Sequence, residues 1–206
     1  AHVNPSSLYE LKTLSVAALA GVPRAVQLLL APQDIDFPVH VFPTALSFAA
    51  AEGHVEVARA LIAAKAHVDV LYGGEVTPLS DATRRGSIEL LELLLDSRAD
   101  VNQRNFRGQT TLFFAVGNNR SRAVELLIAR GAEVDAVDED KTTPLLIAIR
   151  SGYADVAKVL LRSRARLDVV NAEGRTPLHH AAVKGYAVTL ECLLREAQLT
   201  AMDLNA

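Results

Sequence analysis

Apolar residues recur along this chain in blocks with the spacing of short helices. In one block, residues 77–85 and 88–96 carry apolar side chains at helical rather than alternating spacing. One side of the second run is lined by Leu90, Leu91, Leu94 and Leu95. The polar segment 103–109 that follows consists of turn-forming residues. This pattern predicts two short helices followed by a projecting loop.

The same block recurs every 33 residues. Its start is a Thr with a Leu two places later, at Thr44, Thr77, Thr110, Thr143 and Thr176. Nine places after each Thr stands a residue suited to a left-handed helix end, namely Gly53, Gly86, Asn119, Gly152 and Gly185. A third column holds Asp69, Asn102, Asp135 and Asp168. Because three columns keep one spacing, the sequence predicts five copies of a helix-turn-helix unit.

Each copy also carries signals for where its first helix begins and ends. The Thr side chain is suited to accept a hydrogen bond from a backbone N–H of the first turn. In three copies a Pro follows at the first helical position, where its missing N–H costs nothing, at Pro78, Pro144 and Pro177. The Gly then closes the helix. We therefore expect each Thr to be an N-cap.

The segment Thr176-Pro177-Leu178-His179-His180-Ala181-Ala182, with Gly185 and Leu193-Leu194, resembles the ankyrin repeat. The resemblance covers nearly the whole chain and implies an all-α fold, an ankyrin-repeat solenoid of helix-turn-helix units with projecting β-turn loops. An earlier, degenerate copy lacks the Thr-Pro pair. We therefore expect a single ankyrin domain over residues 1–206, the first repeat acting as a cap, with repeats at approximately 12–43, 44–76, 77–109, 110–142, 143–175 and 176–206.

The chain departs from the family pattern at one position. The usual His two places after the Pro is present only as His179, and the other copies have Ser47, Ser80, Phe113 and Leu146. The hydrogen bonds that this His makes in the family are therefore not assured in those copies.

Composition narrows the classes of function. The chain has 21 Lys and Arg against 24 Asp and Glu, a formal charge of −3, which argues against a nucleic-acid binder. Its one cysteine, Cys192, excludes an internal disulfide and a thiolate-rich zinc site, so we expect a reducing, intracellular compartment, cytoplasmic or nuclear. No apolar run approaches the roughly 20 residues of a membrane span. The histidines show no metal-ligand spacing, and no metal or cofactor is expected.

The resemblance places partner binding on a concave surface formed by the turns and the first helices. The candidate partner-binding residues at these positions are Tyr72, Arg84, Arg85, Phe106, Arg107, Asn118, Asp140 and Arg150. Their middle part is basic and aromatic, a composition favoured at interface hot spots. We therefore predict a monomeric protein-interaction module, not an enzyme, that binds a protein or peptide. The resemblance also makes Asn102 a candidate for hydroxylation.

Other interpretations remain open from sequence alone. Charged loop residues are often only a solvated surface, which applies to the acidic segment around Asp140. Asp81 stands where these helices are commonly apolar, so it is either the ion-pair partner of Arg84 or Arg85, or a general acid or base. An enzyme or small-molecule binder would use Asp81, Arg84, Tyr72 and Asp140. A third alternative is one domain of a larger scaffold, such as a ubiquitin-ligase adaptor.

Overall fold

A computed structural model describes residues 13–30, 44–187, 189–191 and 193–195. The chain divides into two compact units, residues 1–105 and 106–206. The regular elements of the described residues are helices, and the only β interaction among them is an isolated bridge between Tyr72 and Val76. The ends of the predicted first and last repeats, residues 31–43 and 196–206, and Cys192 lie outside the described residues.

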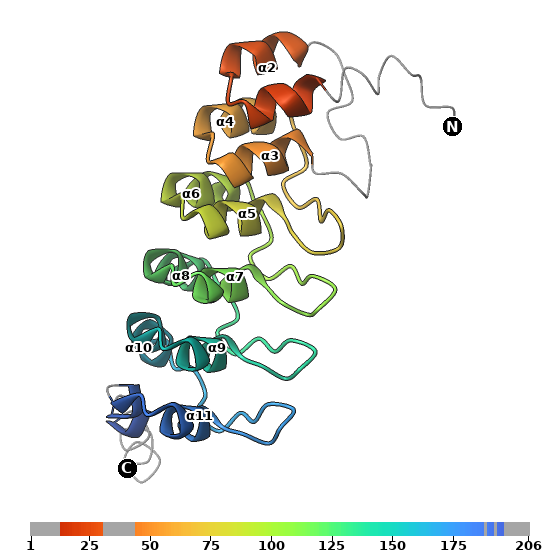
Figure 1. Cartoon of the computed structure of the whole chain (residues 1–206). Helices are drawn as coiled ribbons and strands as arrows, with labels where there is room; N and C mark the ends of the chain where they lie inside the picture. Colours follow the sequence, from red (N-terminus) through yellow and green to blue (C-terminus); the bar gives the residue numbers. More distant parts are fainter. Residues whose placement is uncertain (1–12, 31–43, 188, 192, 196–206) are drawn as a thin grey trace. The chain divides into compact units, whose positions relative to one another are not determined.

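The first unit is built from paired helices (Figure 1). A helical stretch at 13–19 precedes its labelled helices, which are α2 (Pro23–Leu29), α3 (Ala45–Glu52), α4 (Val55–Ala63), α5 (Pro78–Arg85) and α6 (Ile88–Asp96). Helices α3 and α4 pack as one pair and α5 and α6 as the next, while α3 contacts α5 and α4 contacts α6. Each first helix therefore packs on the next first helix, and each second helix on the next second helix.

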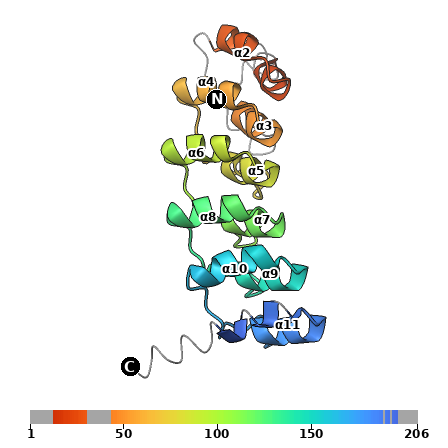
Figure 2. The ribbon, with the colours of Figure 1, turned by 90° about the vertical axis from the view of Figure 1, so that its left-hand side faces the viewer.

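The second unit repeats this arrangement. Its helices are α7 (Thr111–Gly117), α8 (Ser121–Ala129), α9 (Pro144–Ser151), α10 (Ala154–Arg162) and α11 (Pro177–Lys184). Figures 1 and 2 show α7 and α9 in one row and α8 and α10 in another, and α11 continues the row of α9. The loops before α9 and α11 project from the helices in Figure 1. These loops and the first helices form one face of the unit.

Most of the predicted helix starts are confirmed. The side chains of Thr44, Thr77, Thr143 and Thr176 each accept a hydrogen bond from the backbone N–H three residues on. Thr110 also holds the N-cap position of α7, but the predicted side-chain hydrogen bond is absent there, and its hydroxyl is buried without a hydrogen-bond partner in the structure. There the Phe113 N–H donates to the backbone carbonyl of Thr110 instead, at 3.0 Å.

The hydrogen bond of the family histidine is made by His179 itself in α11 and by a serine in α5. In α11, the Thr176 N–H donates to His179 Nδ1 at 3.2 Å, which completes a capping box. In α5, Ser80 Oγ completes the capping box by accepting a hydrogen bond from the Thr77 N–H at 2.9 Å. Phe113 and Leu146 have no polar atom that could accept this bond. A serine therefore preserves the family contact in α5, and the apolar residues do not.

The helix ends agree with the predicted left-handed column. Gly53, Gly86, Gly152 and Gly185 have positive φ angles between 67° and 83°, and Asn119 has φ 53°. Leucines of both the first and the second helices lie in the core, and Leu94, Leu127 and Leu160, which recur every 33 residues on the second helices, have no exposed surface. The repeat thus sets both the chain reversals and the packed positions.

Candidate functional site

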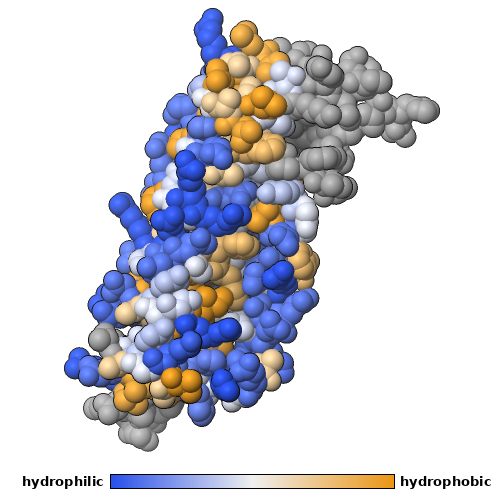
Figure 3. All heavy atoms as spheres, in the orientation of Figure 1, coloured by the Kyte–Doolittle hydropathy of each residue, from blue (hydrophilic) through white to orange (hydrophobic). Residues whose placement is uncertain are grey.

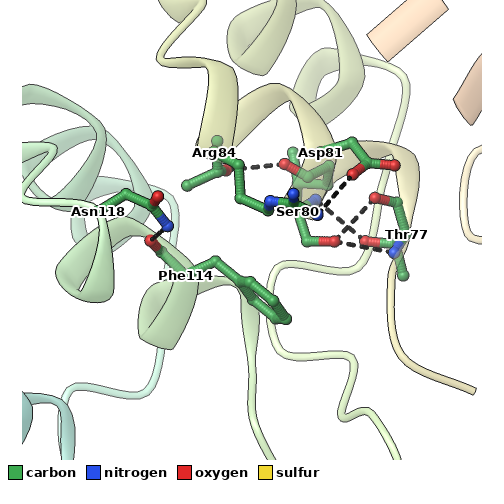
Figure 4. Close-up of polar contacts among 8 residues, drawn as sticks. Thr77, Ser80, Asp81, Arg84, Phe114 and Asn118 are labelled. Atoms are coloured by element: carbon green, nitrogen blue, oxygen red, sulfur yellow. Dashed lines mark hydrogen bonds and ion pairs between the residues drawn. The ribbon is translucent and has the colours of Figure 1, made fainter. Parts of the chain in front are cut away.

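Asp81 is a buried acid on α5 with one cationic partner. Its exposed fraction is 4%, and Arg84 Nη1 lies 3.4 Å from Asp81 Oδ1, one helical turn away (Figure 4). Burial raises the pKa of Asp81 to about 6, and the positive charge of Arg84 opposes this shift. The second carboxylate oxygen, Oδ2, is buried without a hydrogen-bond partner. The predicted ion pair is confirmed, and its partner is Arg84.

Arg85 forms an ion pair with a different acid, Glu52. Its Nη1 lies 3.5 Å from Glu52 Oε2 at the end of α3, and both side chains are about half exposed. Ion pairs this exposed contribute about 0 to 1 kcal/mol to stability. Arg85 therefore links two neighbouring repeats at the surface, and the ion pair of Asp81 is with Arg84.

Tyr72 completes this cluster in the first unit. Its N–H donates to the Val76 carbonyl at 3.1 Å, which closes the turn through Gly73 and Gly74, both with positive φ. Burial raises the pKa of the Tyr72 hydroxyl, and the charge of Asp81 raises it further. Tyr72 on the turn before α5 thus lies within electrostatic range of Asp81 and Arg84 on α5.

In the second unit, Phe106 and Arg107 form an exposed pair at a turn tip. Phe106 is 53% exposed, and the Arg107 guanidinium carbon lies 5.4 Å from the centre of its ring. This distance is typical of a cation–π contact. A hydrogen bond joins this turn to the turn of the next repeat, because the Glu139 N–H donates to the Arg107 carbonyl at 3.0 Å. An aromatic ring is therefore presented to solvent on a restrained loop.

Asn118 and Asp140 have local roles that sequence did not show. Asn118 Nδ2 donates to the Phe114 carbonyl at 2.8 Å, so the amide satisfies a carbonyl at the end of α7 (Figure 4). The Asp140 carbonyl accepts from the Ala172 N–H at 3.1 Å, which joins this turn to the next, while the exposed Asp140 side chain projects to solvent. The side chain of Asp140 therefore remains available to a partner.

Arg150 borders a cavity of about 560 Å³ in the second unit. Its walls come from the end of α9, the turn before α11 and α11 itself. Arg150 shares them with Arg175 and Lys184, and Glu173 supplies one carboxylate. The face seen in Figure 3 is predominantly hydrophilic over the turn loops of this unit, with hydrophobic residues interspersed. The cavity brings together three cationic side chains that are up to 34 positions apart in the sequence.

Comparison with known proteins identifies the family. The model for ankyrin repeats matches three stretches of the chain, residues 14–105, 96–171 and 112–203. This chain is an ankyrin repeat protein. Its fold is accordingly an all-α ankyrin solenoid, and ankyrin repeat proteins generally act as protein-interaction scaffolds rather than enzymes.

Solved ankyrin repeat structures resemble most of this ankyrin chain. An ankyrin repeat domain from Acinetobacter baumannii AYE is 29% identical, with a TM-score of 0.82 over 89% of this chain and 97% of that domain. The ankyrin repeat domain of Bcl-3, described as a unique member of the IkappaB protein family, is 28% identical, with a TM-score of 0.83 over 89% of this chain and 85% of that domain. No curated protein matches the chain.

The predicted binding residues of this ankyrin protein fall on both units. Tyr72, Arg84 and Arg85 belong to the first unit, and the other five belong to the second. Sequence reasoning missed the part played by Arg175 and Lys184 beside Arg150, since a turn and a helix end bring them together. It also predicted Asn102 as a hydroxylation site, and the structure places it in the turn after α6, where its N–H donates to Asp100 Oδ1 at 2.9 Å. Hydroxylation at Asn102 stays a prediction.

Within residues 13–30, 44–187 and the short described stretches after them, no group of three or more His, Cys, Asp or Glu side chains is placed to hold a metal ion. None of the helices in the described part of the chain is long and apolar enough to cross a bilayer.

Proposed function

We propose that this ankyrin protein is a non-enzymatic interaction module that binds a protein or peptide on the face formed by its turn tips and first helices. The exposed Phe106 ring, stacked with Arg107, is the observation that carries the proposal. An aromatic residue exposed on a restrained loop buries a large area on binding and loses little conformational entropy. The binding face of the second unit then includes Asn118, Asp140 and Arg150.

The first unit contributes its own candidates. Tyr72 lies on the turn before α5, and Arg84 and Arg85 lie on α5, so all three occupy positions that ankyrin proteins use for partners. Arg84 and Arg85 are about half exposed, so their guanidinium groups remain accessible although each has an acidic neighbour. We propose that the module needs no cofactor, acts as a monomer and works inside the cell, in the cytoplasm or nucleus.

The test is an affinity pull-down from lysate of the source organism. The bait carrying Phe106→Ala and Arg107→Glu is compared with the unmodified chain by mass spectrometry of the bound proteins. A matched control, Arg122→Glu on the exposed side of α8, makes the same charge reversal on a second helix. The proposal predicts a partner that is lost from the double variant and retained by the control, with thermal unfolding unchanged in both. Identical bound sets would contradict it.

One observation favours a second candidate, small-molecule binding at the first unit. The buried Asp81 Oδ2 has no hydrogen-bond partner, Arg84 pairs with the other oxygen of that carboxylate, and the charge of Asp81 also acts on Tyr72. A ligand that donates a hydrogen bond to Asp81 would satisfy this atom. Screening for compounds that raise the melting temperature of the unmodified chain but not of Asp81→Asn tests this candidate. A screen without such compounds leaves the interaction module as the better account.

A further inference from the structure

The cavity in the second unit concentrates positive charge in a protein with a net negative charge. Arg150, Arg175 and Lys184 line it together with one acid, Glu173, while the whole chain carries a formal charge of −3. Glu173 Oε2 lies 3.4 Å from Arg175 Nη1, so this acid is matched by one of the three cations. Among the described residues, Arg150 and Lys184 have no ion-pair partner. The cavity therefore has an excess of two positive charges.

The wall formed by the turn is held in place by a buried amide. Asn171 Oδ1 accepts from the N–H of Glu173 at 3.0 Å and from the N–H of Arg175 at 2.9 Å. The Asn171 side chain is buried, so these bonds are shielded from competing water. Arg175 therefore projects from a turn that is already ordered, and little backbone entropy is lost when a ligand binds.

His180 forms a buried part of the same cavity. Its Nε2 lies 3.4 Å from Asn171 Nδ2, and its exposed fraction is 8%. Burial lowers the pKa of His180, and the charges of Arg150 and Arg175 lower it further. The charges of both guanidinium groups therefore lower the pKa of the same buried imidazole, which agrees with the position of Arg150 and Arg175 around one cavity.

The cavity also has an apolar part. Ile147 on α9 and Val183 on α11 line it, and Val183 is 74% exposed, so its side chain is accessible to a ligand. A volume of about 560 Å³ is within the range of ligand sites and is larger than one side chain needs. The chemistry of the walls thus fits a short segment with a carboxylate and an apolar neighbour.

We propose that this cavity binds an acidic side chain, Glu or Asp, with an apolar neighbour, on a peptide segment of the partner protein. The inference rests on the proposed interaction function and names the chemistry that the partner presents there. Arg150 and Lys184 supply the charges that pair with the carboxylate, and Ile147 and Val183 contact the apolar neighbour. Nucleic acid is the less favoured anion, because the whole chain carries a formal charge of −3 and would repel an extended phosphate backbone.

The experiment measures the anisotropy of short fluorescein-labelled peptides titrated with the full chain. One peptide alternates glutamate and leucine, and its matched control alternates glutamine and leucine. The proposal predicts that the glutamate peptide binds and that the glutamine peptide binds at least about tenfold more weakly. Arg150→Glu with Lys184→Glu weakens the glutamate peptide by a similar factor and favours a lysine–leucine peptide instead. Arg122→Glu with Arg162→Glu, exposed on α8 and α10, changes the net charge equally and leaves binding unchanged.

Several results would overturn the inference. Equal binding of the glutamate and glutamine peptides would do so without any variant, and so would equal loss of binding in the control variant. A single-stranded oligonucleotide that displaces the peptide and binds more tightly would assign the cavity to a phosphate backbone instead. Where charge reversal prevents folding, Arg150→Gln with Lys184→Gln serves in its place. If the pull-down finds a partner that depends on Phe106 but the glutamate peptide does not bind, only the inference about the cavity fails. If the glutamate peptide binds but the Phe106 variant retains every partner, the proposal centred on Phe106 fails instead.

Discussion

The Asp135 carboxylate accepts a hydrogen bond at 2.9 Å from the backbone N–H of Arg166, 31 residues later. The same contact occurs two repeats earlier, where Asp69 Oδ1 accepts from the Asp100 N–H, also at 2.9 Å and 31 residues on. The Asp column that sequence revealed as a repeat marker therefore has a physical role. It joins the end of one repeat to the end of the next through a backbone N–H.

Removal of this contact should weaken the second unit. We expect Asp135→Ala to lower the free energy of unfolding by about 1 kcal/mol, because the Arg166 N–H loses its acceptor in the protein. Asp135→Asn keeps an oxygen at the same position and should cost less. Urea unfolding followed by circular dichroism measures both. Equal losses in the two variants would show that the charge, and not the hydrogen bond, matters.

The buried acid should make stability depend on pH. The folded pKa of Asp81, about 6, lies above its ordinary value of 3.8, so the folded state holds the proton more tightly than the unfolded state. This stabilisation is fully present below 3.8 and is lost as the pH rises through about 6. A shift of this size corresponds to about 2 to 3 kcal/mol. Asp81→Asn has no carboxyl group to titrate, so its stability does not fall in this way. As the pH rises from below 3.8 to above about 6, the free energy of unfolding of Asp81→Asn should increase by about 2 to 3 kcal/mol relative to that of the unmodified chain.

The Arg84 side chain provides the control for this pH effect. Because its charge opposes the rise in the Asp81 pKa, Arg84→Gln should move the pH-dependent loss of stability to higher pH. Chemical unfolding at a series of pH values between 4 and 8 follows all three proteins. Parallel stability profiles for the unmodified chain and Asp81→Asn would refute the assigned titration.

A left-handed position after each second helix offers a route to higher stability. Lys65, Arg98 and Arg164 adopt φ angles between 63° and 67°, and the matching residue in the fourth copy is Gly131, with φ 91°. Side chains are strained in this conformation and glycine is not. We expect Arg98→Gly to raise the free energy of unfolding by about 0.5 to 1 kcal/mol.

Gly131→Ala is the matched reverse change. An added Cβ at Gly131 would meet no other atom within 4 Å, so only backbone strain opposes the substitution. It should lower the free energy of unfolding by about 1 kcal/mol. Thermal melts of Arg98→Gly, Gly131→Ala and the unmodified chain test the pair. A lower free energy of unfolding for Arg98→Gly would mean that the contacts of the Arg98 side chain stabilise the fold by more than the backbone strain destabilises it.

The buried leucine column should be the most sensitive part of the core. Leu127 on α8 has no exposed surface, so Leu127→Ala should cost about 2 to 5 kcal/mol through lost burial and the cavity left behind. Leu28, which is 72% exposed on α2, is the control, and Leu28→Ala should change stability by less than about 0.5 kcal/mol. Comparable losses at the two positions would contradict the assigned core.

Sequence alone determined the repeat, the helix ends and the buried columns of this protein. These features depend on residues close together in the chain, such as Thr77 with Ser80 or Gly86 at the end of α5, and a period of 33 residues repeats each signal several times. The structure alone revealed an exception, since Thr110 occupies the N-cap position of α7 and its side chain makes no capping hydrogen bond.

The tertiary structure decided which side chains act together. Asp81 has Arg84 and Arg85 at nearly equal sequence distance, but packing of α3 against α5 places Glu52 beside Arg85 and leaves Arg84 to the buried acid. Arg150, Arg175 and Lys184 come from a helix end, a turn and the next helix, and no sequence spacing indicates that they share one cavity. The stacking of one repeat on the next brings them together, because it determines which surface residues of different repeats become neighbours.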